Sequence, residues 1–403
     1  MHASNHAPSK ERSLKKVGYF LYLSIFSFIL LEVVIRVLST PNKANVELFL
    51  NKKHHYLLPL PADSSSYYQE SIAKEKKDSY RIYHDTLGWS HAKWGADTAK
   101  FDCYSNDKGY RISKAEYKSK QKAKTRYNIV AIGNSFTHGD AVKAEDTWVY
   151  KLQELYGEPI ANLGVGGYGI HQALLRLITS NVNADTVLFG VIWGDLERAL
   201  EPVYTFYQGG NKTRPILKFK KDGNYSLVNV PVMEPQEFYK SKLKHEEEIF
   251  EYINGFDKNV FSKSLWTYSY ALRLLKSTQH QKRNSKEKPV YLRDDERMAY
   301  CMKIFELFQD YCQSKGIYGR IVLLDTGQNF WHKEKWDLDN PWDLLKDKLN
   351  KKNINFLEYH AELSQAFNED RTKLIHPIEN LHYSPEGNTL VANLIYQSLT
   401  QSN

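Results

Sequence analysis

Three short segments of the sequence carry the residue types that acyl-transfer chemistry uses. The first is the Gly-Asn-Ser-Phe-Thr run at 133–137, which follows directly on an apolar stretch. A serine on a sharp turn between a strand and a helix is exposed at the carboxyl edge of a parallel sheet, where open α/β sheets bind ligands. Ser135 is therefore a candidate nucleophile, and its backbone N–H can face a developing oxyanion. The same residues would also suit an ordinary helix N-cap, so this segment alone does not decide between the two.

The second segment is rich in glycine and again follows a short apolar stretch. It reads Asn-Leu-Gly-Val-Gly-Gly-Tyr-Gly at 162–169. Glycines at such a turn let backbone N–H groups approach a ligand closely. An ordinary βα turn or a dinucleotide-binding loop would also be glycine-rich, but the spacing here fits the nucleotide fingerprint poorly.

The third segment places a carboxylate three residues before a histidine, at Glu379 and His382. A carboxylate at this spacing can turn back to hold the imidazole and leave Nε2 free for the proton of a serine. A histidine that is neutral near pH 7 is a competent general base. The three segments together predict a serine nucleophile, Ser135, with His382 as its base and Glu379 as the orienting carboxylate.

The elements that must position these segments alternate between strands and helices. Strands are predicted at 128–132, 159–163, 186–192, 319–324 and 354–357. Helices are predicted at 147–156, 171–179, 294–315, 342–349 and 384–399. Asp146 is placed to cap the first of these helices and Gly157 to end it. This alternation predicts an α/β fold, a flavodoxin-like three-layer α/β/α arrangement with a mostly parallel sheet.

The alternation is interrupted between about residues 200 and 290. An Asp-Gly turn at 222–223 lies between two apolar stretches and predicts a hairpin over 215–231. Two helices are predicted after it, near 235–252 and 262–276. We interpret the region as an insertion at one end of the sheet, which serves either as a substrate lid or as packing.

The N-terminus contains an apolar segment, 17–38, of the length that a helix needs to cross a bilayer. Lys and Arg residues precede it, which by the positive-inside rule keeps the tail at 1–16 in the cytoplasm and places the rest of the chain outside. Glu32 and Arg36, four residues apart, lie on one face near the far interface. A cleaved signal peptide is the alternative, but no small-residue cleavage site follows the segment. Residues 39–125 are interpreted as a stalk and lead-in, and 126–400 as the α/β domain.

Composition excludes several classes of protein. With 42% hydrophobic and 25% charged residues among 403, global disorder is not expected. The net charge of +8 would suit an acidic partner, yet no nucleic-acid-binding motif accompanies it. Three cysteines do not form a disulfide framework, and no His, Cys or carboxylate cluster has the spacing of metal ligands. We therefore expect no metal, no cofactor and no nucleic acid; the sequence does not indicate an oligomeric state.

The three segments resemble the sequence blocks of the SGNH (GDSL-like) hydrolase superfamily, in particular its bacterial members with one N-terminal transmembrane helix. The run at 133–137 is similar to the nucleophile block, with Asn134 where Asp is usual. The run at 162–167 is similar to the second block, which implies that the N–H of Gly167 is an oxyanion donor. The third segment is similar to the Asp-x-x-His block, with Glu379 for Asp.

One position departs from the family pattern. The third block usually ends in Gly-x-Asn-Asp, and its Asn side chain is an oxyanion donor, whereas this chain has Gly194 at the Asn position. Loss of one such donor costs about 100- to 1000-fold in turnover. We expect the N–H of Asp195 to be a replacement donor, and Asn134 and Gly194 to line the substrate site.

Three functions are compatible with these residues. The first is a membrane-anchored serine esterase or deacylase that acts outside the cytoplasm on an O-acylated glycan, lipid or other envelope ester. The second is an O-acyltransferase that uses the same acyl-enzyme and passes the acyl group to a cell-envelope polysaccharide. The third is a non-catalytic glycan-binding or assembly protein on a degenerate hydrolase fold, for which Gly194 is the main argument.

Overall fold

The computed structural model describes eight stretches of the chain. These are residues 8–42, 45–50, 53–57, 80–98, 101–204, 212–228, 264–377 and 382–401. The chain divides into two compact units. The first comprises Met1–Tyr68, Thr205–Gly210 and Gly255–Glu287, and the second Gln69–Tyr204, Asn211–Asn254 and Lys288–Asn403. Each unit is described by itself.

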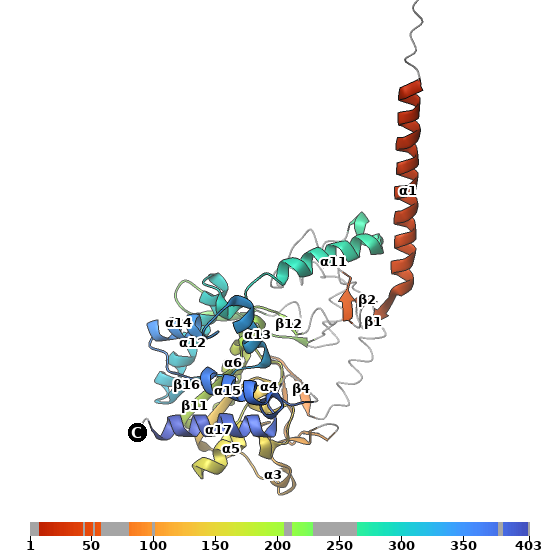
Figure 1. Ribbon diagram of the computed structural model, residues 1–403. Coiled ribbons are helices and arrows are strands. Elements are labelled where there is room, and N and C mark those ends of the chain that lie inside the picture. Colours follow the sequence, from red (N-terminus) through yellow and green to blue (C-terminus); the bar gives the residue numbers. More distant parts are fainter. Residues whose placement is uncertain are drawn as a thin grey trace, which may run out of the picture. The chain divides into compact units, whose positions relative to one another are not determined.

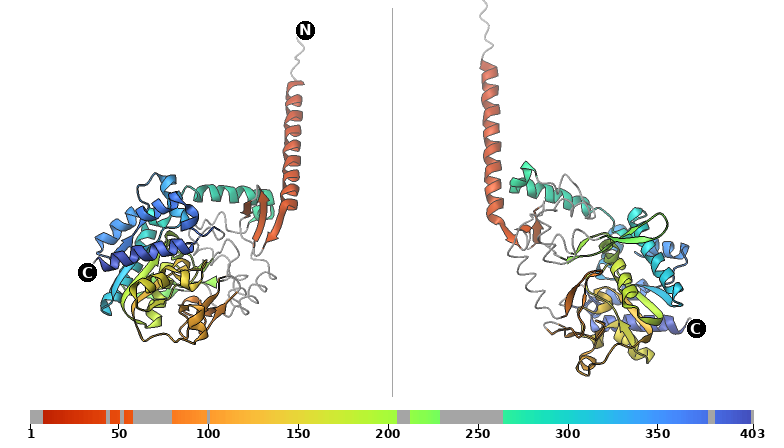
Figure 2. Two further views of the ribbon diagram at one scale, coloured as in Figure 1. Left: turned by 60° about the horizontal axis from the view of Figure 1, so that its bottom comes forward. Right: turned by 180° about the vertical axis from the view of Figure 1, so that it is seen from behind.

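The first unit contains the apolar N-terminal helix. Helix α1 (Pro8–Leu38) is drawn as one continuous helix in Figures 1 and 2. Its stretch Ser13–Leu38 is long and apolar enough to cross a membrane, and its side chains are almost all exposed. The helix begins earlier than the predicted 17, because Pro is tolerated in the first helical turn and the Lys, Glu and Arg that follow favour helix.

Three short strands follow α1 where an irregular stalk was expected. They are β1 (Ser39–Asn42), β2 (Asn45–Leu50) and β3 (Lys53–Tyr56). The strands pair antiparallel in the order β1-β2-β3. Pro41 lies in β1, an edge strand, where a residue without an N–H is tolerated. Pro41 is therefore compatible with a sheet in the segment that was interpreted as a stalk.

The other part of this unit is α11 (Tyr270–Asn284), preceded by a single 3-10 turn at Leu265–Tyr268. The helix predicted at 262–276 is thus present but lies further along the chain. Glu32 of α1 accepts hydrogen bonds from the N–H groups of Tyr270 and Ala271, both at 2.9 Å. It also accepts one from the Ser269 hydroxyl at 2.8 Å. The carboxylate of a membrane-type helix therefore caps the start of α11, where backbone N–H groups have no partner within the helix.

Replacing Glu32 with alanine should loosen the start of α11. The helix would lose the acceptor of two first-turn N–H groups, and loss of a cap acceptor costs about 1 kcal/mol. Hydrogen–deuterium exchange of the peptide at 268–275, measured on the full chain in detergent, should then be about five- to tenfold faster. Glu32→Gln keeps an acceptor oxygen and should show a smaller change. Equal exchange in wild type and Glu32→Ala would refute the capping role.

The second unit is built around an eight-stranded sheet with the order β17-β16-β11-β9-β10-β8-β7-β6. The strands are β6 (Ala96–Asp97), β7 (Cys103–Ser105), β8 (Arg111–Ile112), β9 (Arg126–Gly133), β10 (Ile160–Asn162), β11 (Asn183–Val191), β16 (Tyr318–Leu323) and β17 (Phe356–Glu358). The five strands from β17 to β10 are parallel, and β8, β7 and β6 continue the sheet antiparallel. The predicted α/β fold with a mostly parallel sheet is confirmed.

Helices lie on both sides of this sheet (Figure 1), and a hydrophobic core is formed on each of its two faces. One core is formed with α6 (Ile170–Ser180), α12 (Glu296–Ser314) and α14 (Asp343–Lys351). The other is formed with α5 (Trp148–Tyr156), α15 (His360–Glu369) and α17 (Pro385–Thr400). Successive residues of β9 alternate between the cores, since Val130 joins the first and Ile129 and Ala131 the second. The arrangement is the expected three-layer one.

Shorter elements complete the described chain. The helices are α3 (Lys114–Lys118), α4 (Ser135–His138), α7 (Trp193–Arg198), α13 (Gly327–Trp336) and α16 (Arg371–Leu374), with 3-10 turns at Ala144–Asp146 and Val290–Leu292. The strand pairs are β4 (Arg81–His84) with β5 (Gly88–His91), β12 (Val203–Tyr204) with β13 (Lys212–Thr213), and β14 (Ile216–Phe219) with β15 (Tyr225–Val228). The last pair is the predicted hairpin, with Gly223 at φ +84°. The helix predicted at 235–252 lies outside the described residues.

Two boundary predictions need correction. The sheet extends into the segment interpreted as a lead-in, because β6, β7 and β8 lie upstream of residue 126. These strands are two or three residues long, too short to show an alternating pattern. The N-cap of α5 is Thr147, which accepts a hydrogen bond from the N–H of Tyr150 at 3.2 Å, rather than Asp146. Gly157 ends α5 with φ +75°, as predicted.

Candidate active site

Ser135 is the first residue of α4, the short helix that follows β9 at the carboxyl edge of the parallel sheet. Asn134 caps this helix, since its Oδ1 accepts a hydrogen bond from the N–H of Phe136 at 2.7 Å. The N–H of Ser135 lies in the first turn, where N–H groups have no intrahelical partner. The serine is thus held at a helix N-terminus, which favours negative charge nearby.

Gly133 makes the turn into α4 possible. Its φ of +152° is a backbone conformation that side chains rarely allow. A Cβ added there would lie 2.5 Å from the Gly190 carbonyl oxygen of β11 and 2.3 Å from Thr137 Oγ1. Glycine is therefore required both for the turn and for the close approach of β9 and β11.

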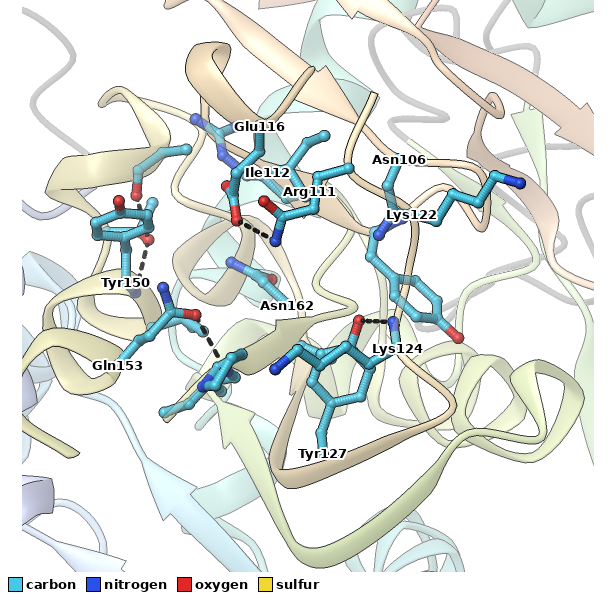
Figure 3. Close-up of a pocket in the computed structure, with 18 residues that line it drawn as sticks. Asn106, Arg111, Ile112, Glu116, Lys122, Lys124, Tyr127, Tyr150, Gln153 and Asn162 are labelled. Atoms are coloured by element: carbon cyan, nitrogen blue, oxygen red, sulfur yellow. Dashed lines mark hydrogen bonds between the residues drawn. The ribbon is translucent and has the colours of Figure 1, made fainter. Parts of the chain in front are cut away.

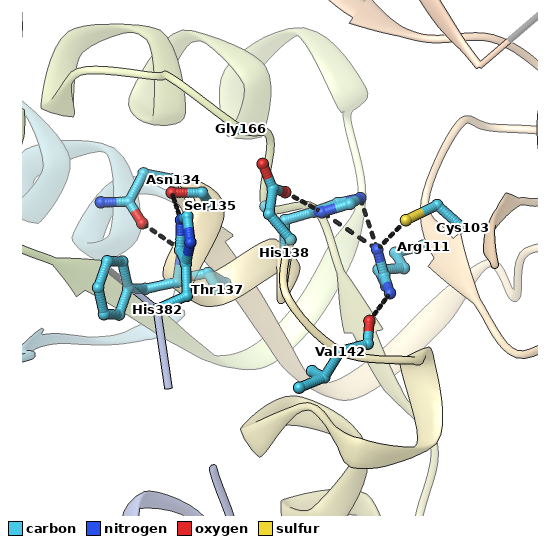
Figure 4. A network of polar contacts seen from close by, with 12 residues as sticks. Cys103, Arg111, Asn134, Ser135, Thr137, His138, Val142, Gly166 and His382 are labelled. Carbon is cyan, nitrogen blue, oxygen red and sulfur yellow. Dashed lines mark hydrogen bonds and ion pairs between the residues drawn. The ribbon is translucent and has the colours of Figure 1, made fainter. Parts of the chain in front are cut away.

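His382 faces Ser135 from the segment before α17. Its Nε2 lies 2.9 Å from Ser135 Oγ, and Figure 4 shows the two side chains pointing toward each other. The Phe136 ring packs against the imidazole with 5.0 Å between ring centres. Ser384 caps α17 by accepting from the N–H of Gly387 at 2.9 Å, so the histidine is followed by a well-defined helix start. The residues predicted as nucleophile and base, 247 positions apart, are in hydrogen-bond contact.

The predicted orienting carboxylate, Glu379, lies outside the described residues, which leave out 378–381. Its part in the site stays a prediction.

The glycine-rich loop after β10 packs on the nucleophile helix. Asn162 Nδ2 donates to the Thr137 carbonyl at 2.8 Å, and its Oδ1 accepts from the N–H of Gly164 at 3.0 Å. A Cβ on Gly164 would lie 2.4 Å from the backbone nitrogen of His138, so only glycine permits this contact. The first and second sequence segments are therefore brought together, as expected from two neighbouring parallel strands.

Gly167 lies further along the same loop, with φ +82°. A Cβ there would come within 2.8 Å of the Tyr204 ring. Both features require glycine and let the backbone lie close to its neighbours. Gly167 as an oxyanion donor remains a prediction.

The structure does not support the predicted role of the Asp195 N–H. That group already donates to the Ile192 carbonyl at 3.0 Å, in the first turn of α7. The contact with the nucleophile turn is made by the Asp195 side chain. It is buried, accepts from the Ile192 N–H at 3.1 Å, and accepts a short hydrogen bond from Asn134 Nδ2. Burial raises the pKa of this carboxyl to about 6, although Arg198 and Asn134 act in the opposite direction.

A buried polar network lies on the other side of α4 and was not predicted. His138 Nδ1 is 2.5 Å from Asp140 Oδ1, and its Nε2 is 2.7 Å from the Tyr80 hydroxyl. Arg111 reaches the same imidazole at 3.1 Å and donates to the Val142 carbonyl at 2.7 Å (Figure 4). Burial opposes ionisation of Asp140, but His138, Arg81 and His382 outweigh it and hold its pKa below the usual range. The sequence held one signal for this network, because His138 and Asp140 follow closely after the candidate nucleophile Ser135.

A pocket lies near the basic stretch at 118–124 (Figure 3). Lys122, Lys124, Tyr127, Tyr150 and Gln153 are among its lining residues, whereas Ser135 and His382 are not. Gln153 Oε1 accepts from the Ile160 N–H at 2.9 Å, and the Tyr127 hydroxyl accepts from the Lys124 N–H at 2.9 Å. These polar groups thus serve the local structure, and the pocket is separate from the serine site.

His332 of α13 should make the free energy of unfolding depend on pH. Burial and the nearby Lys335 lower the pKa of this imidazole to about 4, below its ordinary value of 6.5. The unfolded chain then binds a proton between pH 6.5 and 4 that the folded chain does not, so the free energy of unfolding falls as pH falls through this window. We expect His332 to contribute a loss on the order of 2 kcal/mol.

The test is urea unfolding of the full chain in detergent at pH 7 and pH 4.5. His332→Gln should reduce the difference between the two pH values, and Lys335→Met should reduce it by less. The prediction would be contradicted if the free energy of unfolding changed between pH 7 and pH 4.5 as much in both variants as in wild type.

Solved structures with a similar arrangement of elements include hydrolases. One, described as a lipolytic protein of the G-D-S-L family from Desulfitobacterium hafniense DCB-2, is 16% identical over 68% of this chain and 99% of its own, with a TM-score of 0.31. The chain is similar to lipolytic proteins of the G-D-S-L family. A second such protein, from Veillonella parvula DSM 2008, is 12% identical over 68% of this chain and 98% of its own, with a TM-score of 0.31.

A third structure, described as an acylhydrolase from Bacteroides fragilis NCTC 9343, is 15% identical over 70% of this chain and 89% of its own, with a TM-score of 0.30. No protein-family model and no curated protein matches the sequence. Likeness of this degree does not identify an activity, so the functional argument depends on the site.

Proposed function

We propose that this chain is a serine esterase or deacylase that acts through Ser135 and His382 and is held at a membrane by α1. The contact of 2.9 Å between Ser135 Oγ and His382 Nε2 carries the proposal. A serine alone is a common helix N-terminal residue. A serine whose hydroxyl meets an imidazole nitrogen, at the carboxyl edge of a parallel sheet, has the arrangement of an activated nucleophile.

The reaction follows from this contact. His382 Nε2 takes the hydroxyl proton while Ser135 Oγ bonds to the ester carbonyl carbon, whose oxygen becomes an oxyanion. Collapse of this intermediate breaks the bond to the alcohol, which leaves with the proton from His382. Water then repeats the two steps on the acyl-enzyme and releases the acid. The N–H groups of Ser135 and Gly167 are the proposed oxyanion donors, and Glu379 is the proposed partner of the imidazolium.

The proposed substrate is an O-acylated glycan, lipid or other envelope ester outside the cytoplasm. The support is the length of α1 together with the Lys and Arg residues that precede its apolar part, since positive charge favours the cytoplasmic side. An O-acyltransferase would use the same acyl-enzyme with a sugar hydroxyl in place of water.

A second candidate is a glycan-binding protein without catalysis. It is favoured by Gly194, which offers no side-chain donor to an oxyanion.

A fluorophosphonate serine probe separates the two candidates. The full chain in detergent is incubated with the probe, digested, and the modified peptide is identified by mass spectrometry. Modification of the peptide that contains Ser135 supports the esterase. A folded chain that takes up no probe would support the binding protein instead.

A further inference from the structure

The guanidinium of Arg198 lies beside Gly194, in space that a side chain at position 194 would enter. A Cβ built on Gly194 would be 3.9 Å from Arg198 Cζ, an ordinary van der Waals contact. Arg198 is four residues after Gly194 in α7, and side chains of a helix point back toward its N-terminus. The arginine therefore extends along α7 toward the carboxyl end of β11, which is the edge of the sheet where Ser135 lies.

A chain of hydrogen bonds ties this guanidinium to the nucleophile turn. Arg198 Nη1 donates to Asp195 Oδ1 at 2.7 Å, and the other oxygen of that carboxylate accepts from Asn134 Nδ2. Asn134 in turn caps α4 and immediately precedes Ser135. Asp195 is buried, so it holds the guanidinium in place with little competition from water.

The Arg198 guanidinium has more N–H donors than its hydrogen bond to Asp195 uses. A guanidinium carries five N–H groups. Within the described part of the chain, the hydrogen bond to Asp195 is the one that this side chain makes, so its Nε and Nη2 groups have no protein partner there. The side chain is 27% exposed, which leaves it accessible to a ligand. A guanidinium that is fixed by one hydrogen bond, with other N–H groups that make none, can donate to an anion that forms during a reaction.

We propose that Arg198 is an oxyanion donor of this site, in the place that Gly194 leaves without a side chain. The proposal rests on the proposed esterase function. When Ser135 Oγ bonds to the carbonyl carbon, the carbonyl π electrons move to oxygen and His382 receives the serine proton. A free N–H of Arg198 donates to this oxygen while it is negative. The bond weakens again when the carbonyl re-forms and the alcohol leaves with the proton from His382, so Arg198 itself gains and loses no proton.

The test compares rates of fluorophosphonate labelling in the full chain, because phosphonylation also develops negative charge on an oxygen bonded to the attacked atom. Arg198→Ala should label about 100- to 1000-fold more slowly than wild type, the usual effect of losing one oxyanion donor. Arg198→Lys keeps the charge without the planar fork and should fall between the two.

Two double variants separate a donor from a mere counter-ion of Asp195. Gly194→Asn in the Arg198→Ala background supplies a new amide donor at a position with room for it, and should recover at least tenfold in rate. Asp195→Asn in the same background removes the unpaired carboxylate and should recover nothing. Thermal unfolding of each variant shows that it is folded.

Arg198→Ala labelled within about threefold of wild type would overturn the proposal, as would recovery by Asp195→Asn rather than by Gly194→Asn. These outcomes leave the proposed function intact, since wild type is labelled in each. A wild-type chain that takes up no probe at Ser135 refutes both the function and this inference.

Discussion

Ser135→Ala should abolish labelling by a fluorophosphonate probe, while the chain stays folded. The substitution removes one oxygen atom, and that atom makes the contact with His382 Nε2 at 2.9 Å. The Cα and the backbone of α4 are retained, and alanine has the highest helix propensity. We therefore expect the melting temperature to change by no more than about 2 °C, which corresponds to about 1–2 kcal/mol for a chain of this size.

His382→Ala should reduce the labelling rate about 100- to 10,000-fold, the range that general-base catalysis contributes. Ser180→Ala is the matched control, because this serine donates to the Leu177 carbonyl of its own helix at 2.8 Å and is the last residue of α6, at the end away from the glycine-rich loop. It should label as wild type does. A Ser135→Ala chain that is still labelled would place the reactive serine elsewhere and refute the assignment.

Gly133→Ala should destabilise the second unit strongly, by roughly 2–6 kcal/mol. Part of this cost is steric, since the added Cβ would lie 2.5 Å from the Gly190 carbonyl oxygen of the neighbouring strand. That oxygen belongs to the backbone, so it can move only if the pairing of β9 with β11 shifts; overpacking of this kind costs about 1–3 kcal/mol. The remaining part is the φ of +152°, which for a residue with a side chain costs about 1–3 kcal/mol more.

Two other glycines serve as controls for this effect. Gly157→Ala meets nothing within 4 Å but has φ +75°, so it should cost only about 1–2 kcal/mol. Gly327→Ala meets nothing within 4 Å and has no positive φ, so its stability should stay close to wild type. Unfolding of the three variants in urea gives the order of stability. A Gly133→Ala chain as stable as Gly157→Ala would show that the turn can relax.

The strands and helices of the sheet domain could largely be predicted from the sequence. Buried parallel strands such as β9 and β11 are continuous apolar stretches, and α5 and α17 have recognisable ends at Gly157 and Ser384. Such signals are local, so one sequence suffices to detect them. The strands β6 to β8 were missed because two or three residues show no period. The strand β1 was missed because it contains Pro41, and proline is rare within strands.

The sequence by itself determined which residues could react. Ser135 and His382 were identified from their local surroundings, a turn after a strand and a histidine just before a helix, since those surroundings depend on residues close in the chain. The tertiary structure decided which groups meet. The hydrogen bond between the Asp195 carboxylate and Asn134 depends on how α7 packs against the turn at Asn134. Such contacts join segments about 60 residues apart, and hydrogen-bond geometry across that separation is set by the packing of the sheet.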